Sequence, residues 1–252
     1  MLTAYLNNTR RLLQNPSAPT ALYSDADLTT WINIARGQLC GEGECARLHA
    51  TISTIAGTNA YNFSAVSTGT SSANGIEGII NISSIRYAIA SGYRWISPKS
   101  WPWFSLYELN NPVPPTGPPV LWSQFAQGAA PPSPDIVGGG SFYISPVPDN
   151  IYALTLDCVC YPIPLVDDTT VEAIPYLWTD AVPFFAAYYA LLSAQNNARM
   201  ADAERYFNHY TKFVERARVA SNPSVNRWMY RQAGDPAQAG KLSQQSAAGG
   251  VG

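Results

Sequence analysis

Proline is concentrated in one stretch of the chain, since 14 of the 20 prolines lie between Pro98 and Pro164. A proline inside a helix removes a backbone hydrogen bond and clashes with the preceding turn, so this stretch excludes long helices. It predicts short strands joined by extended loops such as residues 111–119. Short strands separated by Pro and Gly turns are typical of a β-sandwich or a small barrel.

The hydrophobic pattern agrees with this, because from Arg47 onward apolar residues recur with a period of two. Segments of this kind that are rich in β-branched and aromatic residues predict strands. The expected strands cover residues 49–55, 61–66, 79–87, 120–125, 141–145 and 151–161.

The N-terminal part follows the helical period of about 3.6 residues instead. Residues 2–13 form one apolar stripe and predict a first helix. A second helix is expected to begin after Ser24, which has capping-box spacing to Asp27. Gly41 and Gly43 are expected to end it.

Helices return near the C-terminus. Asp180 is expected to cap a helix whose residues 184–192 are apolar on nearly all sides, so this helix should be central and buried. An amphipathic helix is predicted over residues 199–220. A tail of Gly, Ala, Gln and Ser follows from Gly234 to Gly252, with the composition of a disordered segment.

These patterns divide the chain into four segments. An N-terminal helix pair covers 1–46, and an inserted β domain with Pro-rich loops covers 47–172. A second helix pair in 173–222 completes a bundle, and 223–252 is an extended C-terminal anchor and tail. We therefore expect an α+β fold, in which the helix pairs form a bundle and the inserted domain is an antiparallel β-sandwich or barrel.

Composition limits the classes of function. Charged residues make up only 13 % of the chain and the net charge is −2, which argues against a DNA-coating protein with a basic face. With 15 Tyr and 7 Trp, much of the surface must be neutral and aromatic, as in protein interfaces. The chain therefore has the composition of an assembly subunit.

No targeting or membrane segment is expected. Residues 1–6 lack the basic and apolar regions of a secretory signal. The longest apolar stretch, residues 181–194, is shorter than the roughly 20 residues that a membrane-spanning helix needs. We expect a soluble protein made in a cytoplasm.

Signals of enzymatic chemistry are weak. The two histidines, His49 and His209, have no nucleophile and orienting carboxylate in a recognisable pattern. Residues 41–46 match G-x-G-x-x-A, but they follow a helix and precede a strand, the reverse of a dinucleotide site. Asp167 and Asp168 are a poor acid–base pair, because adjacent residues of an extended segment point to opposite sides. We expect no catalytic, cofactor-binding or metal-binding residues.

The four cysteines, Cys40, Cys45, Cys158 and Cys160, do not have the spacing of a usual zinc knuckle. Buried free thiols are the better interpretation for a protein made in a cytoplasm. A Cys40–Cys45 disulfide is an alternative only if the chain belongs to an exported or extracellular particle.

Two aromatic clusters stand out, and alternatives are open for each. Trp95, Trp101 and Trp103, with Phe104 and Tyr107 nearby, are a packed corner of the core, a protein interface or a sugar-stacking platform. The aromatic-basic stretch from Arg227 to Arg231 is a helix end or an anchor that precedes the tail.

The pattern of the helical segments resembles a known family. The N-terminal part carries Tyr23-Ser24-Asp25-Ala26-Asp27-Leu28 followed by Trp31-Ile32-Asn33-Ile34-Ala35-Arg36, and the C-terminal part carries Ile174, Pro175 and Trp178 before an Ala-rich helix. This arrangement is similar to that of the head-to-tail connector (adaptor) proteins of tailed bacteriophages, in their podovirus-type form. The middle β region resembles the inserted β domain of the larger members in its architecture.

The resemblance implies a non-enzymatic virion protein of the phage neck, made in the host cytoplasm. Such proteins form a homo-oligomeric ring, typically of twelve copies, which joins the portal protein to a tail nozzle or tail tube. Double-stranded DNA passes through the lumen without specific binding, and the slightly acidic net charge is compatible with that. No cofactor or membrane is implied.

The resemblance also implies interface residues. In relatives an extended C-terminal segment docks on the portal, and this role would fall to Arg227, Trp228, Met229, Tyr230, Arg231, Leu242 and Val251. Trp101, Trp103, Phe104 and Tyr107 are the candidates for a contact with the tail or with a neighbouring copy.

Two other classes of function are open. A decoration or receptor-binding protein of a virion would use the Trp95–Tyr107 region and form trimers in most cases, whereas a connector forms a ring of twelve. A cell-wall hydrolase would use paired carboxylates such as Asp167 and Asp168.

Overall fold

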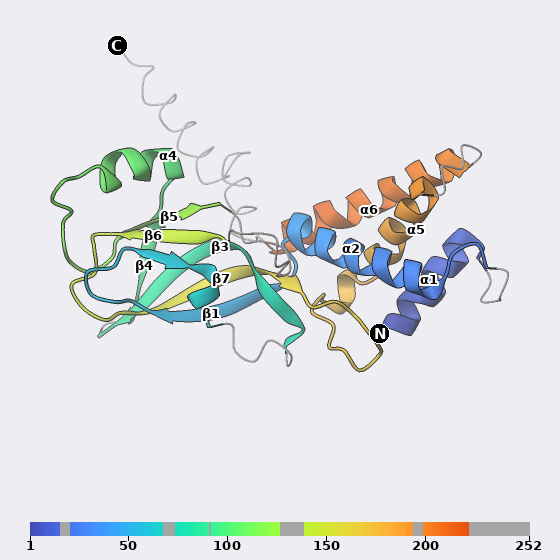
Figure 1. Ribbon diagram of the computed structural model, residues 1–252, viewed down its shortest axis with the longest axis horizontal. Coiled ribbons are helices and arrows are strands. Elements are labelled where there is room, and N and C mark those ends of the chain that lie inside the picture. Colours follow the sequence, from blue (N-terminus) through green and yellow to red (C-terminus); the bar gives the residue numbers. More distant parts are fainter. Residues whose placement is uncertain (16–20, 68–73, 91, 127–138, 194–198, 222–252) are drawn as a thin grey trace, which may run out of the picture.

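Four helices from the two ends of the chain lie side by side: α1 (Leu2–Leu13), α2 (Asp25–Gly43), α5 (Ala181–Ser193) and α6 (Met200–Ser221). The computed structural model describes residues 1–15, 21–67, 74–90, 92–126, 139–193 and 199–221. The molecule is elongated, with these helices at one end, the helical half, and a curled sheet at the other, the sheet half (Figure 1). The predicted α+β class is confirmed.

The start of α2 is as predicted, and of the two glycines expected to end it, Gly43 is its last residue whereas Gly41 lies inside it. The Ser24 hydroxyl accepts a hydrogen bond of 3.1 Å from the backbone N–H of Asp27, which satisfies one free amide of the first turn. The helix does not stop at Gly41. It continues through Gly43 and ends where Glu44 adopts a left-handed conformation with φ of 51°. A glycine inside a helix costs only about 1 kcal/mol, which packing of the helix against its neighbours offsets.

Two side chains, that of Arg199 just before α6 and that of Tyr206 within it, satisfy the last carbonyl groups of α1. The Arg199 guanidinium donates to the carbonyl of Leu13, and the Tyr206 hydroxyl donates to the carbonyl of Leu12, both at 2.8 Å. These carbonyls have no partner within their own helix. The contacts hold the C-terminal end of α1 against the N-terminal end of α6.

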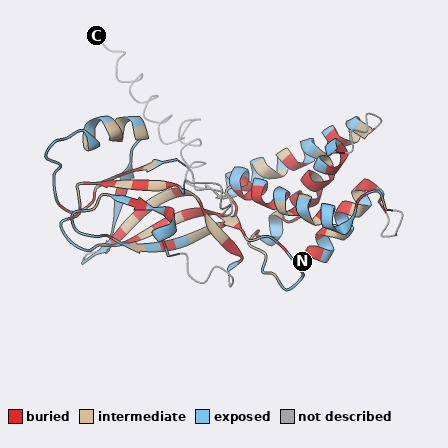
Figure 2. Cartoon of the chain, viewed as in Figure 1, coloured by how far each residue is buried: buried red, intermediate tan, exposed pale blue. Residues whose placement is uncertain are grey.

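The core between the helices is built from small residues of α5 and larger ones of α2 and α6. Small side chains on α5 let its neighbours approach closely, so the predicted central position of this helix is confirmed for most of its residues. Buried residues line the sides of the helices that face one another (Figure 2). Core members include Ile32, Ala35, Leu39, Ala186, Ala187, Ala190, Leu191, Ala203, Tyr210 and Ala217.

Seven strands form one curled sheet in the order β1-β7-β3-β4-β5-β6-β2. They are β1 (Arg47–Ser53), β2 (Ala60–Asn62), β3 (Ile76–Ile89), β4 (Gly92–Pro98), β5 (Leu121–Phe125), β6 (Ser141–Ser145) and β7 (Ala153–Pro162). Backbone hydrogen bonds join Thr51 of β1 to Ser67, which follows β2 in the chain. Because β1 and β2 stand at opposite ends of the strand order, this contact shows that the sheet curls on itself. Its interior is filled by apolar residues such as Ile85, Trp122, Phe142, Leu154 and Leu156.

The expected antiparallel β-sandwich or barrel is not confirmed, because the sheet is mixed. β4 and β5 pair in parallel through Ser97–Leu121 and Pro98–Trp122, while the other pairs are antiparallel. A parallel pair needs a long connection between its strands. Here the connection contains the short helix α4 (Trp101–Phe104), a π-helical turn η2 (Ser105–Leu109) and the Pro-rich loop that follows.

Most strands match the predicted segments, with two exceptions. β4 is not among the predicted segments, although Tyr93 and Trp95 alternate with Arg94; its first four residues are all exposed, so burial does not follow that alternation. The segment predicted as a strand over 61–66 is only β2 followed by the 3₁₀ turn η1 (Phe63–Ala65). By contrast, β6 has the predicted bounds.

The helical half meets the sheet half at a close contact between α2 and β7. A Cβ atom placed on Gly37 of α2 would lie 2.2 Å from the hydroxyl oxygen of Tyr161 on β7. A Cβ atom at this position fits only if the Tyr161 side chain moves. On the same helix, Gly41 faces open space.

These two glycines provide a matched test of the helix–sheet contact. Gly37→Ala should lower the free energy of unfolding by about 1–3 kcal/mol, because the Tyr161 ring must move. Gly41→Ala, the same substitution in the same helix, should leave stability unchanged or raise it by up to about 1 kcal/mol. Chemical denaturation of both variants measures the difference, and equal effects would contradict the close packing.

Candidate functional site

A fully buried arginine of α2 joins the helical half to the segment that leaves β7. The guanidinium of Arg36 is 0 % exposed and lies 2.8 Å from the carboxylate of Glu172, whose side chain is 10 % exposed. Arg36 donates to this carboxylate through both Nε and Nη2, and through Nη1 to the carbonyl of Ile163 at 2.7 Å. A buried charge is tolerated only when it is paired and hydrogen-bonded in this way.

Asn33, one turn earlier on α2, extends the same network. Its side-chain oxygen accepts from the backbone N–H of Leu165 at 2.8 Å, and its amide donates to the carbonyl of that residue at 3.1 Å. The Asn33 oxygen also accepts from Arg36. Two polar side chains of one helix therefore hold both ends of the connecting segment 163–172 in place.

The network links the two helical sequence motifs, one in the N-terminal part and one in the C-terminal part. Asn33 and Arg36 belong to the Ile-Asn-x-Ala-Arg stretch, and Glu172 accepts a hydrogen bond of 3.0 Å from the backbone N–H of Ile174 in the second motif. Ile174 itself is buried among the helices. Stretches about 140 residues apart thus form one junction, and sequence reasoning identified both without finding the partner, Glu172.

A second junction contact lies at the end of α6. Arg47 of β1 donates from Nε to the Asp157 carboxylate of β7 at 3.2 Å and from Nη1 to the carbonyl of Ser221. The last described residue of the chain is therefore tied to the sheet. Residues 222–252 lie outside the described part, and with them all seven predicted portal-contact residues.

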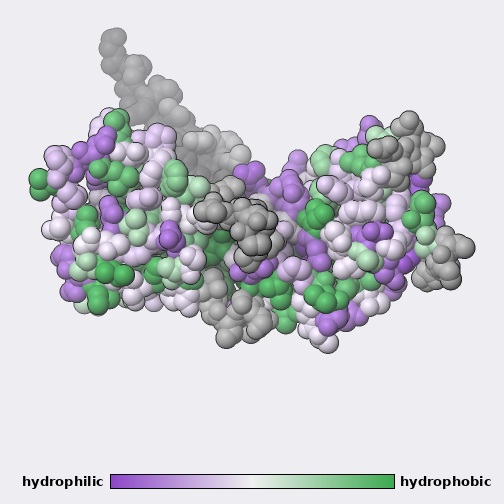
Figure 3. Space-filling model, in the orientation of Figure 1, coloured by the Kyte–Doolittle hydropathy of each residue, from purple (hydrophilic) through white to green (hydrophobic). Residues whose placement is uncertain are grey.

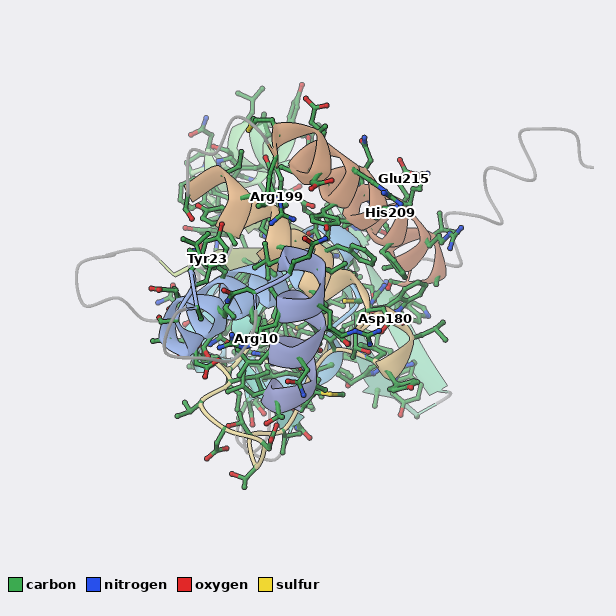
Figure 4. All side chains as sticks on the ribbon, turned by 90° about the vertical axis from the view of Figure 1, so that its right-hand side faces the viewer. Arg10, Tyr23, Asp180, Arg199, His209 and Glu215 are labelled. Atoms are coloured by element: carbon green, nitrogen blue, oxygen red, sulfur yellow. The ribbon has the colours of Figure 1, made fainter. Side chains whose placement is uncertain are left out.

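An open groove lies between α1, α5 and α6 and is called the helical groove below. Its volume is about 650 Å³, and its lining residues are Asn8, Arg11, Leu12, Asp180, Pro183, Phe184, His209 and Phe213. The imidazole of His209 stacks on Phe184, with ring centroids 5.2 Å apart. Asp180 and His209 lie on the same side of the helical half, with Tyr23 on the other (Figure 4). An apolar floor with a polar rim is the usual anatomy of a protein-binding surface.

The sheet half carries the predicted aromatic cluster, which divides into three roles. Phe104 is fully buried, so it supports α4 from below and offers no surface to a partner. Trp101 packs on Phe125 and Tyr143 of the sheet. Trp103 and Tyr107 lie together further out, 5.2 Å apart, and Tyr107 is 60 % exposed.

Trp95 is separate from that cluster and belongs to the β3–β4 hairpin. It shares one side of the hairpin with Tyr93 and Arg86, and the guanidinium carbon of Arg86 lies 4.6 Å and 5.5 Å from the centres of the two rings. Sequence reasoning missed Arg86 and Tyr93, although the i, i+2 spacing of Tyr93 and Trp95 places two aromatic residues on one face of a strand. Hydrophobic side chains reach the surface on both halves of the molecule (Figure 3).

Asp167 and Asp168 have separate structural roles. Asp167 accepts hydrogen bonds from the hydroxyls and backbone amides of Thr169 and Thr170, which lower its pKa. Asp168 accepts from the Met1 ammonium group at 2.7 Å and from the Thr3 amide at 2.9 Å, which hold its pKa well below the ordinary value. Both carboxylates are ionised at neutral pH, whereas a general acid needs a raised pKa. This pair has no member suited to be the acid of a hydrolase.

All four cysteines are buried and free, as predicted. Burial raises the pKa of Cys160 to about 12, so its thiol stays protonated at neutral pH. Within the described ranges, no three His, Cys, Asp or Glu side chains gather as a metal site. The described helices include none that is long and apolar enough to span a membrane.

Replacement of Glu172 tests the junction. Glu172→Gln should lower the free energy of unfolding by about 3–5 kcal/mol, because it leaves the charge of Arg36 buried without a counter-charge. Asp25→Asn removes the partner of Arg10 in a pair whose acidic side chain is 68 % exposed, and should cost less than about 1 kcal/mol. Urea denaturation of both variants provides the comparison. A loss for Glu172→Gln as small as that of the control would contradict the structural importance of the pair.

Comparison with known proteins adds one finding. The sequence model of a protein family described as SU10 adaptor protein matches residues 3–236. The match covers both helix pairs and the whole sheet. No curated protein matches the chain significantly.

Proposed function

The chain belongs to the SU10 adaptor protein family, and from this premise we propose that it is the head-to-tail connector of a phage particle. It is thus a phage structural adaptor protein of the virion neck, which associates with other virion proteins such as portal and tail. In the proposed role, copies of the chain form a ring between the portal vertex and the tail. The family match over nearly the entire chain is the observation that carries the proposal.

The structure supports a mechanical role of this kind. A connector must keep its head-facing and tail-facing surfaces at a fixed separation under the load of packaged DNA. The Arg36–Glu172 pair and the Asn33 contacts hold the two halves of the molecule together through a buried polar network. Such a network restricts the junction to one arrangement, because any other would leave a buried charge unpaired.

We propose a ring of about twelve copies, as the family resemblance implies, with the DNA channel continuing through its lumen. The net charge of −2 and the low charge content support passage of DNA without tight binding. Exposed aromatic residues on both halves support contacts with several partners at once, because Trp, Tyr and Arg dominate the energetics of interfaces.

The portal contact is proposed for the C-terminal segment. Residues 222–252 follow Ser221, which Arg47 ties to the sheet. A segment of 31 residues spans at most about 110 Å when fully extended, enough to reach a neighbouring ring. Arg227, Trp228, Met229, Tyr230 and Arg231 would form the anchor, with Leu242 and Val251 as further contacts.

The contact with the tail or a neighbouring copy is proposed for the outer surface of α4 and η2. The rings of Trp103 and Tyr107 pack together there beside Lys99, whose ammonium group lies 4.9 Å from the Trp103 ring. Leu106 next to them is also exposed. Trp101 contributes by holding this short helix on the sheet.

Deletion of residues 234–252 tests the portal anchor. The folded part should be unaffected, with an unchanged circular dichroism spectrum and unfolding midpoint, because the deleted segment lies beyond α6. Heads made with this variant should fail to acquire tails, as counted by electron microscopy. Infectious tailed particles that contain the truncated chain would refute the anchoring role.

A second test separates surface from core in the aromatic cluster. The double variant Trp103→Ala, Tyr107→Ala should change the free energy of unfolding by less than about 1 kcal/mol, yet reduce the number of tailed particles. Phe104→Ala should instead cost about 3–5 kcal/mol, because it empties a buried site. Denaturation curves and particle counts measure the two effects. Normal tail attachment by a stable double variant would show that this surface contacts no partner.

A further inference from the structure

Helix α5 has no charged residue, and it is apolar on nearly every side. A helix of that kind is normally buried all round. In the single chain α5 is covered by α1, α2 and α6, yet Tyr189 and Leu192 remain 41 % and 37 % exposed and Phe184 is half-buried. Two strips of this helix therefore lack cover.

The first strip continues onto α6. The Phe207 ring of α6, 38 % exposed, packs 4.9 Å from the ring of Tyr188, the sequence neighbour of Tyr189 on α5, and Met200, seven residues before Phe207 on the same helix face, is also 38 % exposed. Tyr189 stacks on Phe185, whose ring lies 4.6 Å from that of the buried Tyr210. The ridge thus rests on a firm aromatic base. We call the four exposed side chains, Tyr189, Leu192, Met200 and Phe207, the aromatic ridge.

The second strip is the floor of the helical groove. Phe184 of α5 and Phe213 of α6 stack there with centroids 6.2 Å apart, beside His209. One residue turns a helix by about 100°, so Phe207 and His209 lie about 200° apart around α6. The aromatic ridge and the helical groove are therefore on opposite flanks of the α5–α6 pair.

Charge differs between the two flanks. Glu204 stands four residues after Met200 and three before Phe207, the spacing of neighbours on one helix face, and it is exposed. On the groove side, Arg205, Lys212 and Arg216 are exposed and stand three or four residues from His209 or Phe213. Arg11 adds another positive charge to the groove rim. Asp180 also lines the groove, so its border carries charges of both signs with the basic residues in the majority. The acidic Glu204 beside the ridge thus matches a border that is basic on balance.

From these observations we propose that the aromatic ridge of one copy of the chain docks in the helical groove of the next copy. The inference rests on the proposed function, in which copies assemble around the neck. Two different, complementary surfaces on opposite flanks form a head-to-tail contact, and such a contact closes into a ring when its rotation allows. Contact with second copies covers both strips of α5 in every molecule, because the ridge of each copy docks in the groove of one neighbour while its own groove holds the ridge of the other neighbour.

Cysteine crosslinking in assembled particles tests this contact. The variants are Phe207→Cys, His209→Cys and the double variant with both, all at exposed positions. Particles carrying each variant are treated with a short bifunctional maleimide and analysed on denaturing gels. The wild-type chain, whose four cysteines are buried, measures the background.

A head-to-tail contact predicts a ladder of crosslinked dimers, trimers and larger species for the double variant and only background for either single variant. Ile151→Cys combined with His209→Cys is the matched control, because Ile151 is 71 % exposed but lies on the sheet half between β6 and β7, and it should produce no ladder.

Three other results would overturn the inference. Crosslinking of Phe207→Cys with itself would show a two-fold contact instead. A double variant that is present in tailed particles but does not crosslink would place neighbouring copies elsewhere while leaving the proposed function intact. Tailed particles that lack the chain entirely would overturn the proposed function, and the inference with it.

Discussion

The buried ion pair between Arg36 and Glu172 determines how the helices meet the sheet, and the rest of the molecule is arranged around it. Burial of an isolated guanidinium is costly, so every conformation that separates these two side chains is penalised. Together with Asn33, the pair therefore fixes the position of the segment from Ile163 to Glu172 relative to α2. That segment joins β7 to α5, and its position decides where the second helix pair packs on the first.

This junction has a direct consequence for an adaptor. A protein that joins two assemblies must transmit the position of one to the other, which a loose link between halves would not do. The close contact at Gly37 and the link from Arg47 to Asp157 and Ser221 add further constraints at the same place. Outside the junction the chain has few charged residues and many exposed aromatic side chains. The residues that fix the junction and the aromatic residues available for contacts with partners thus lie in separate parts of the structure.

The exposed surfaces also show that packing within a single chain does not cover all the apolar side chains that this sequence places on its helices. Helix α5 has the composition of a helix covered on every side, yet the single chain leaves two strips open. Phe104 and Trp103 are neighbours in sequence and both aromatic, but one is core and the other lies outward. They differ in burial because of how the short helix α4 is oriented on the sheet, and amino-acid composition does not determine that orientation.

Local patterns were sufficient for the four long helices and for most strands. The cap at Ser24, the stripe of α1, the amphipathic face of α6 and the bounds of β6 follow from spacing along the chain, because the forces that set them act between residues a few positions apart. Tertiary structure decided the rest. The partner of Arg36, the parallel pairing of β4 with β5 and the convergence of groove-lining residues from three helices all join residues far apart in sequence. Such contacts depend on which surfaces meet after the chain collapses, and no local period encodes that choice.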